Sequence, residues 1–584
     1  MLKHYLPLAI VPIALILWGL LGATQLTSAS FFSLVDYHSP YFGRGTAGTS
    51  GDPLTPQVVI IVADGLRLDE SQKMDNLNAL RARGADRGMR VGLPSLSLPG
   101  WSVIETGAWQ EQHGQSTNFN ARTLALDSIF LAAKRKGLAT ALTGSPGWEV
   151  LFKGHVDIFR IEPDPKDAHH HLDEVRLQDD AIEADALSLL KSNPNLLLIH
   201  FTAPDNAYHG YGVFSPEGQR ARQDVDARLG RLLQNINLER STVFFTADHG
   251  HIDRGGHGGP DEEVRTVEFV AAGRAIRPGK YGGAQQADIA PTTAVLLGTS
   301  LPADSQGDIL SDMLDMPLRM QSERALAWSQ QIVVRYTEIA SVIGIGTIDH
   351  PKLAEAEAAF KSGNDSATIA AAQSEVSSTR ESVLAFREGR LQQERLTRTP
   401  LFLLYLLPLA LYIWFVRRMQ WEFRRPLIGA VVYFIIYFAL FFGQGYSFTL
   451  SMLNEDTQIL TWFAARTVDA IIALGGSALL LGVLSRGEYR VWTVLNTFNM
   501  AFFIAAILWF QICIFFWLYD FTWAWYLPDQ VFGFKYYIDV LQTGAFMVKS
   551  PPVPTILLMP LLALGAKWLT ERATRLFSRV SVSI

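Results

Sequence analysis

The sequence has little cysteine and little charge. It contains one cysteine among 584 residues, and only 18% of its residues are charged, compared with about 25% in typical soluble domains. A single cysteine excludes both a disulfide scaffold within the chain and a CxxC metal site. The formal net charge of −6 gives no global attraction to nucleic acid. The hydrophobic content of 49% excludes a disordered chain and leaves a surplus of apolar residues to be placed.

The apolar surplus is concentrated at the two ends of the chain. An uninterrupted apolar run covers residues 5–23, and the later long runs fall at about 401–416, 427–442, 459–484, 491–519 and 553–566. About 20 apolar residues are needed to cross the hydrocarbon core of a bilayer. We therefore predict an N-terminal transmembrane anchor in residues 1–27 and an α-helical membrane domain with about five transmembrane helices in residues 399–584. A cleaved signal peptide is the alternative for the N-terminal run.

The charges beside these runs predict an orientation. Cations flank the runs on one side, namely Lys3, Arg417, Arg418, Arg424, Arg425, Arg486, Arg490, Lys567, Arg572, Arg575 and Arg579. The loops on the other side are mostly acidic and carry Glu455, Asp456, Asp520, Asp529 and Asp539. Cytoplasmic loops of membrane proteins are enriched in lysine and arginine, so both termini are predicted to be cytoplasmic. The chain is then a multi-pass protein of the cell membrane whose residues from about 24 to 398 face the extracytoplasmic side.

Between the two apolar ends, residues 28–319 alternate between strand-like and helix-like patterns. Near-continuous apolar runs at 57–63, 196–201 and 242–246 predict buried parallel strands, with weaker candidates at 139–142 and 268–271. Helical patterns cover 74–83, 124–136, 175–191 and 217–235. The alternation predicts an α/β domain with a doubly wound sheet. Residues 320–398 are predicted to form a helical stalk or hairpin that joins this domain to the membrane domain.

Carboxylates and imidazoles follow the predicted strands. Ligands bind beyond the carboxyl ends of the strands in such sheets, so these side chains are expected to meet at one edge. The set consists of Asp64, Asp205, His209, Asp248, His249 and His257. A single Asp-Gly pair after a strand is usually an ordinary turn, but D-x-x-x-H, D-H-G and H-G after separate strands are not. Mixed carboxylate and imidazole sets suit zinc or manganese better than magnesium or calcium.

A candidate nucleophile lies at a predicted helix start. Ser97 precedes Pro99 by two residues, and proline suits the first turn of a helix. Free backbone N–H groups and the helix dipole favour an anion at that position. A serine hydroxyl that ligates a metal there can be held as an alkoxide near neutral pH. Ser95 and Ser102 are the local competitors, and helix capping is the alternative role for them.

Taken together, these motifs resemble the alkaline phosphatase superfamily in its phosphodiesterase-like branch. The resemblance covers about residues 55–300 and implies two zinc ions, with manganese as the alternative metal. It implies that Asp205, His209 and His257 hold one ion. It further implies that Asp64, Ser97, Asp248 and His249 hold the other, and that Ser97 takes a phosphoryl group and passes it on.

The residues around Ser97 indicate which branch of the superfamily the sequence resembles most. Sulfatases of the superfamily need an arginine where Trp101 stands. Nucleotide pyrophosphatase/phosphodiesterases usually carry a phosphate-binding asparagine where Gly100 stands, so Gly100 is placed in the predicted substrate-binding set. The segment 94–100, with Val62–Arg67 before it, looks most like the GPI ethanolamine phosphate transferases, which also combine an N-terminal span, an exported phosphatase-like domain and a multispan domain. Those enzymes have many more spans than this chain.

The resemblance implies a transferase that acts at a membrane. Phosphoethanolamine, or a similar headgroup, would pass from a phospholipid donor to a hydroxyl of a glycolipid or glycan acceptor. One alternative is a membrane-anchored phosphodiesterase or phosphatase that hydrolyses a lipid-linked or nucleotide phosphate ester. A second is an inactive phosphatase-fold subunit of a membrane assembly, and in either case the multispan domain offers a surface to membrane protein partners.

Two further features each have two interpretations. Arg466 and Asp469 lie three residues apart inside a predicted span, hence on one helix face. Charged residues at membrane depth predict a functional site, here one for a phospholipid headgroup, and a mutual structural pair is the alternative. The run of three histidines at 169–171, beside Asp167 and Asp173, is either a further metal site or a solvated loop.

Overall fold

The computed structural model describes residues 29–30, 32–41, 47–344, 348–421, 423–452, 456–528 and 552–580. The predicted N-terminal anchor lies outside these residues. The described residues form two compact units. We call the described residues among Leu34–Arg390 and Ala524–Gln530 the α/β unit, and those among Met1–Ser33, Leu391–Trp523 and Val531–Ile584 the helical unit.

A nine-stranded mixed sheet forms the centre of the α/β unit. Its strand order is β4-β3-β5-β1-β6-β7-β2-β8, and β9 pairs with β2. The strands are β1 (Gln57–Ala63), β2 (Ala85–Arg90), β3 (Thr140–Gly144), β4 (Ile158–Ile161), β5 (Leu196–Phe201), β6 (Ser241–Thr246), β7 (Thr266–Gly273), β8 (Gly279–Lys280) and β9 (Ala284–Gln285). Strands β4, β3, β5, β1 and β6 run parallel, whereas β7 is antiparallel to both β6 and β2.

The register of the three central strands aligns their carboxyl ends. Ala63 at the end of β1 pairs with Phe201 at the end of β5, and Val62 pairs with Thr246 at the end of β6. Every residue of these strands is buried, which is why their sequences are near-continuous apolar runs. The residues that follow the three strands therefore leave the sheet side by side at one edge.

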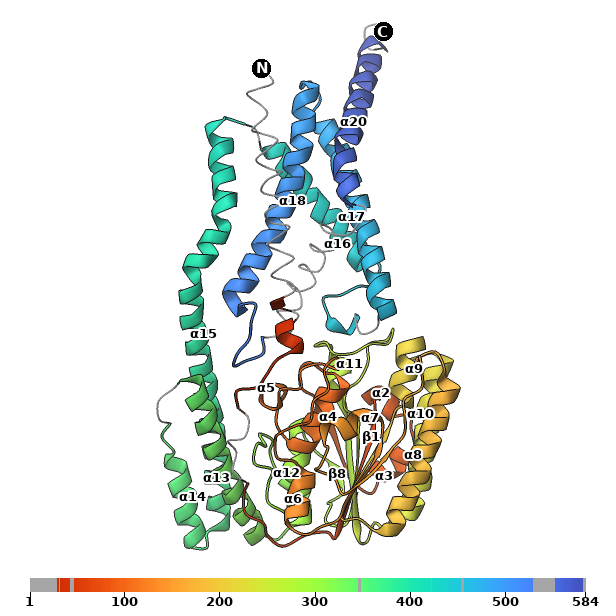
Figure 1. The fold of residues 1–584 in the computed structure, drawn as a ribbon, viewed down its shortest axis with the longest axis vertical. Helices are drawn as coiled ribbons and strands as arrows, with labels where there is room; N and C mark the ends of the chain where they lie inside the picture. The colour runs from red at the N-terminus through yellow and green to blue at the C-terminus, as the bar shows by residue number, and fades with distance from the viewer. Residues whose placement is uncertain are drawn as a thin grey trace. The chain divides into compact units, whose positions relative to one another are not determined.

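Helices cover both faces of the sheet, as Figure 1 shows. The longer ones are α3 (Asp75–Arg81), α4 (Ser97–Thr106), α6 (Ile129–Arg135), α8 (Leu172–Ser192), α9 (Ala203–Tyr211), α10 (Pro216–Asn235) and α12 (Ile289–Leu297). One face carries α3, α8, α9 and α10, which pack on one another, and the other face carries α4, α6 and α12. Single turns form α2 (Leu68–Ser71), α5 (Gln110–His113), α7 (Pro146–Leu151) and α11 (Glu262–Arg265). The predicted doubly wound α/β sheet is confirmed.

Some local predictions differ from the structure. The helix predicted over 124–136 begins only at Ile129, because the Ser128 side chain accepts a hydrogen bond from the Leu131 backbone N–H and caps the helix there. The D-x-x-x-H motif lies on α9, a helix that the sequence analysis did not predict. Strands β2 and β4 were not predicted either.

Three helices follow the sheet. They are α13 (Leu318–Ile343), α14 (Pro351–Lys361), which packs on α13, and α15 (Asp365–Arg418). The predicted boundary between stalk and membrane domain, at residue 398, falls inside α15, which also contains Pro400 and Pro408. A single helix of 54 residues thus contains residues of both units.

The helical unit contains four more long helices among the described residues. They are α16 (Arg424–Gly443), α17 (Asp456–Leu484), α18 (Arg490–Tyr519) and α20 (Pro552–Val580). Four described segments are long and apolar enough to cross a membrane, namely Asp365–Arg418, Arg424–Gly443, Ala464–Leu484 and Arg490–Tyr519. The fifth predicted span, at 553–566, lies in α20, which is not one of these four. The chain is a multi-pass membrane protein.

The first part of α15 is fixed to the α/β unit by an ion pair. The two terminal guanidinium nitrogens of Arg387 donate to the Glu111 carboxylate, at 2.8 and 2.6 Å. The Leu527 backbone N–H donates to the same carboxylate at 3.2 Å. The pair is largely buried, with side-chain exposures of 29% for Arg387 and 15% for Glu111.

We expect Arg387→Ala to lower the thermal unfolding midpoint of the detergent-purified protein. The substitution leaves the Glu111 carboxylate buried without its cation, a loss of about 2 kcal/mol. Glu381→Ala, at an exposed position on the same helix, is the matched control and should leave the midpoint unchanged. Equal midpoints for both variants would show that this ion pair does not stabilise the unit.

Candidate active site

The structure brings the predicted carboxylates and imidazoles together at the carboxyl edge of the sheet. Asp64 follows β1, Asp205 and His209 lie on α9 after β5, and Asp248 and His249 follow β6. Three groups have ligand atoms within 4.8 Å of one another and could hold a metal ion. These groups are Asp64, Asp248 and His249; Asp205, His249, His251 and His257; and His169, Asp205 and His209.

Ser97 is the first residue of α4, as its sequence predicts. Its Oγ lies 3.2 Å from Nε2 of His249. The Asn118 side chain contacts the first two residues of α4. Its Oδ1 accepts a hydrogen bond from the Leu98 backbone N–H at 3.0 Å, and its Nδ2 lies 3.5 Å from Ser97 Oγ. An amide donor therefore lies beside the candidate nucleophile, although Gly100 occupies the place where the resemblance expected one. Asn118 was missed because it comes from an irregular segment with no motif.

The surroundings of the Asp64 carboxylate suit a cation at this edge. Its Oδ2 accepts from Nε2–H of the buried His200 at 3.0 Å. Its Oδ1 is buried, accepts no hydrogen bond from the described residues, and lies 3.4 Å from Nε2 of His249. Burial, followed by the charges of Asp248 and Asp205, raises the pKa of Asp64 well above its ordinary value. A metal ion would satisfy the orphaned oxygen and offset the repulsion between the carboxylates, so the residues present fit one.

Asp248 is oriented by three donors, one of which is the His249 backbone N–H at 3.0 Å from its Oδ1. The Gly65 backbone N–H donates to its Oδ1 at 3.1 Å, and the indole N–H of Trp101 donates to its Oδ2 at 2.8 Å. Trp101 is itself fixed by stacking on Trp148, with ring centroids 4.8 Å apart. The residue that replaces the sulfatase arginine thus holds a carboxylate of the site.

Three imidazoles surround the Asp205 carboxylate. Its Oδ1 lies 3.4 Å from Nε2 of His209, 3.5 Å from Nε2 of His257 and 2.9 Å from Nε2 of His251. Although burial raises the pKa of Asp205, His209 and His251 together hold that pKa well below its ordinary value. The carboxylate is therefore ionised and available to a metal.

The hydrogen bonds of the ring nitrogens separate two roles among these histidines. His257 donates from Nδ1 to the Ser95 carbonyl at 2.9 Å, which leaves a lone pair on Nε2. His251 instead accepts the Gly256 backbone N–H at Nδ1, also at 2.9 Å. In the neutral tautomer that this network assigns, His251 carries its proton on Nε2 and donates to Asp205. His257 thus presents a ligand atom, whereas His251 positions a carboxylate.

His200 and His251 were missed by the sequence analysis. His200 lies inside the apolar run of β5, where it reads as core, and His251 follows the D-H-G motif by one residue. Burial lowers the pKa of both imidazoles to about 3, so both are neutral near pH 7. A polar residue inside the apolar run of β5 and an extra histidine beside D-H-G were the signals that could have identified these two residues.

The three residues predicted to bind substrate have different surroundings in the structure. Gly100 packs against Asp248: a Cβ at this position would lie 3.2 Å from the Asp248 carbonyl oxygen. Arg466 and Asp469 are buried in α17 and pair with each other at 2.8 Å. Gln444 bonds to both of them. This is the geometry of the mutual structural pair, and the headgroup role of Arg466 and Asp469 stays a prediction.

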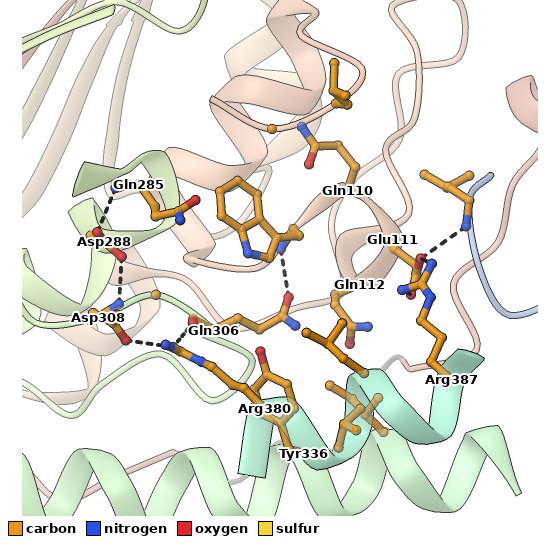
Figure 2. Close-up of a pocket in the computed structure, with 18 of the residues that line it drawn as sticks. Gln110, Glu111, Gln112, Gln285, Asp288, Gln306, Asp308, Tyr336, Arg380 and Arg387 are labelled. Carbon is orange, nitrogen blue, oxygen red and sulfur yellow. Dashed lines mark hydrogen bonds and ion pairs between the residues drawn. The ribbon is translucent and has the colours of Figure 1, made fainter. Parts of the chain in front are cut away.

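A separate cavity of about 550 Å³ lies in the α/β unit and is not the metal cluster. Figure 2 shows that its charged groups face one another, with Arg380 on Asp308 and Arg387 on Glu111. None of the predicted metal ligands lines it. The two arginines that reach it from α15 are already neutralised by carboxylates, so we assign the cavity no part in the chemistry of the cluster.

We expect His251→Ala to weaken metal binding by about 10–100-fold, the usual cost of losing an outer partner of a ligand. Without its imidazole the Asp205 carboxylate loses a 2.9 Å hydrogen bond that orients it. His155→Ala is the matched control, because His155 is buried elsewhere and bonds to Ser128. Competition with a chelator measures the affinity, and an unchanged affinity in His251→Ala would contradict the positioning role.

Comparison with known proteins agrees with the resemblance predicted from the motifs. Residues 58–257 match the model of the type I phosphodiesterase / nucleotide pyrophosphatase family. GPI ethanolamine phosphate transferase 1 of Emericella nidulans is 24% identical over 350 residues, which are 48% of this chain and 36% of that protein. The catalytic subunit of human GPI ethanolamine phosphate transferase 2 is 25% identical over 335 residues, covering 53% and 34% of the two chains. The chain thus spans about a third of the length of these curated relatives.

Solved structures also match part of the chain. Murine ectonucleotide pyrophosphatase / phosphodiesterase 5 superposes on 44% of this chain and all of its own, with a TM-score of 0.36 and 14% identity. The alkaline phosphatase PafA superposes on 45% of this chain and all of its own, with a TM-score of 0.36 and 10% identity. The sequence matches alone carry the comparison: residues 58–257 resemble the type I phosphodiesterase / nucleotide pyrophosphatase family, and the curated relatives of the chain are named GPI ethanolamine phosphate transferases.

Proposed function

We propose that the chain is a membrane-bound, metal-dependent phosphotransferase. It moves phosphoethanolamine, or a similar headgroup, from a phospholipid to a hydroxyl of a glycolipid or glycan. The names of the relatives support the reaction class. The observation that carries the proposal is the position of Ser97: its hydroxyl lies at the start of a helix, 3.2 Å from a histidine of the metal cluster.

Two divalent ions complete the proposed site. Asp205, His209 and His257 would hold one, and Asp64, Ser97, Asp248 and His249 the other. Zinc is the proposed metal and manganese the alternative. When bound, such ions lower the pKa of a hydroxyl and stabilise the negative charge that develops on the phosphoryl group.

The transfer proceeds in two displacements at phosphorus. In the first, Ser97 Oγ forms a bond to the headgroup phosphorus as its own proton leaves, and the bond from phosphorus to the diacylglycerol oxygen breaks. That oxygen takes up a proton, and the headgroup is now a phosphodiester of Ser97. In the second, the acceptor hydroxyl attacks the phosphorus, loses its proton and displaces Ser97 Oγ, which is reprotonated.

The residues around Ser97 have separate tasks in this scheme. The Asn118 amide, 3.5 Å from Ser97 Oγ, is placed to donate to a non-bridging phosphoryl oxygen. The dipole of α4 favours the same negative charge at the helix start. Trp101 and His200 hold Asp248 and Asp64 in place, so that the carboxylates need no reorganisation during the reaction.

The hydrolase alternative differs only in the second displacement, where water replaces the acceptor hydroxyl. It uses the same ligands and the same Ser97 ester. The inactive-subunit alternative is disfavoured because every predicted ligand type is present and gathered at one edge. The positive-inside pattern of the sequence supports an extracytoplasmic site with both termini in the cytoplasm.

We expect Ser97→Ala to lower headgroup transfer by roughly three orders of magnitude or more, because the nucleophile is lost. The assay uses protein in vesicles with labelled phosphatidylethanolamine and a glycolipid acceptor. Ser102→Ala, one turn further along α4, removes only a hydrogen bond to the Leu98 carbonyl and is the matched control. Release of free phosphoethanolamine without a modified acceptor would favour the hydrolase, and full activity of Ser97→Ala would refute the mechanism.

A further inference from the structure

The loop before α8 brings a histidine from outside the predicted ligand set to the metal cluster. His169 stacks on His209, with ring centroids 4.7 Å apart and planes inclined by 26°. Ligand atoms of His169, Asp205 and His209 all lie within 4.8 Å of one another. The alkaline phosphatase resemblance assigned no residue of this loop to the site.

The three consecutive histidines of this loop have different surroundings. His170 Nδ1 lies 2.8 Å from the Asp167 carboxylate, and His171 Nδ1 lies 3.2 Å from the Asp167 carbonyl. Their side chains are 48% and 55% exposed. The solvated-loop interpretation therefore describes His170 and His171, whereas His169 lies against the cluster.

The backbone of the loop fixes the place of His169. Asp167 has a φ of 50°, and its carbonyl accepts the backbone N–H groups of His170 and His171 at 3.0 and 3.2 Å, which closes a tight turn. The loop also packs directly on α9, because a Cβ at Gly210 would lie only 2.0 Å from the His169 carbonyl oxygen. Only glycine at position 210 permits this approach, so the turn and α9 hold the His169 imidazole beside His209.

The ligand count leaves room for this imidazole. Asp205, His209 and His257 are three protein donors. A catalytic zinc with three protein ligands keeps a fourth position for water or substrate and can expand to five ligands, so a fourth protein donor can join the shell. His251 does not supply the fourth, because its Nε2 carries the proton that it donates to Asp205.

We propose that His169 is a further ligand of the metal ion held by Asp205, His209 and His257. This inference rests on the metal centre of the proposed function. The site then has three imidazoles and one carboxylate, a donor set that favours zinc over manganese.

The test measures metal binding of the full-length protein in detergent, independently of transfer activity. His169→Ala is compared with His170→Ala and His171→Ala, which remove the same side chain from the same loop. Zinc per chain is determined across a series of chelator concentrations, and the cobalt-substituted protein gives a visible spectrum that reports coordination. We expect His169→Ala to lose one of two ions at chelator concentrations lower by at least tenfold, in the range of about 10–100-fold seen for metal-site partners, with an altered cobalt spectrum. The two neighbouring variants should match the wild type.

The variant His169→Asp shows whether a loss of metal in His169→Ala is caused by misfolding. Aspartate keeps a donor at the position, so this variant should retain the second ion and show a cobalt spectrum different from both wild type and His169→Ala. Two tightly held ions and an unchanged spectrum in His169→Ala would overturn the inference while leaving the proposed function intact. Absence of any bound metal from the wild type would instead overturn the proposed metal centre itself, and the role of His169 with it.

Discussion

Repulsion among three neighbouring carboxylates, of which Asp64 and Asp248 are buried, is the constraint on which the site depends. The parallel register of β1, β5 and β6 delivers Asp64, Asp205 and Asp248 to one edge of the sheet. Burial and mutual charge raise the pKa of Asp64 and of Asp248. A cation between these carboxylates would offset both their burial and their repulsion. The same arrangement would therefore give this edge an affinity for metal ions.

The imidazoles around these carboxylates have two different roles, and the tautomer of each ring determines which role it has. His249 and His257 point their Nδ1 atoms at backbone carbonyls, so their Nε2 atoms face the cluster with a lone pair. His200 and His251 point Nε2–H at Asp64 and Asp205 and keep these carboxylates oriented. Backbone groups thus decide which histidines can bind a metal and which can only position its ligands. The arrangement preorganises the site before any substrate arrives.

The sequence predicts the parts of this fold that have strong local signals. Strands β1 and β5 were predicted with their observed bounds, because strands buried on both faces are continuous apolar runs. Strand β2 was not predicted because its polar sequence alternates between buried and half-buried positions. Helix α9 was not predicted because Pro204 and Gly210 suggest a loop. The ligands that follow strands could be predicted from topology. Asn118 and His251 reach the site through turns and packing, which one sequence indicates only weakly, and the histidine run at 169–171 left both of its interpretations open.

The proposed mechanism places a metal-assisted nucleophile on a chain with membrane-spanning helices. It depends above all on the formation of an ester at Ser97. The most direct measurement is peptide mass spectrometry of acid-quenched protein after incubation with phosphatidylethanolamine in the absence of acceptor. The account predicts a phosphoethanolamine group on the peptide that contains Ser97. Consumption of the donor with no modified Ser97, or with the group on another residue, would contradict it.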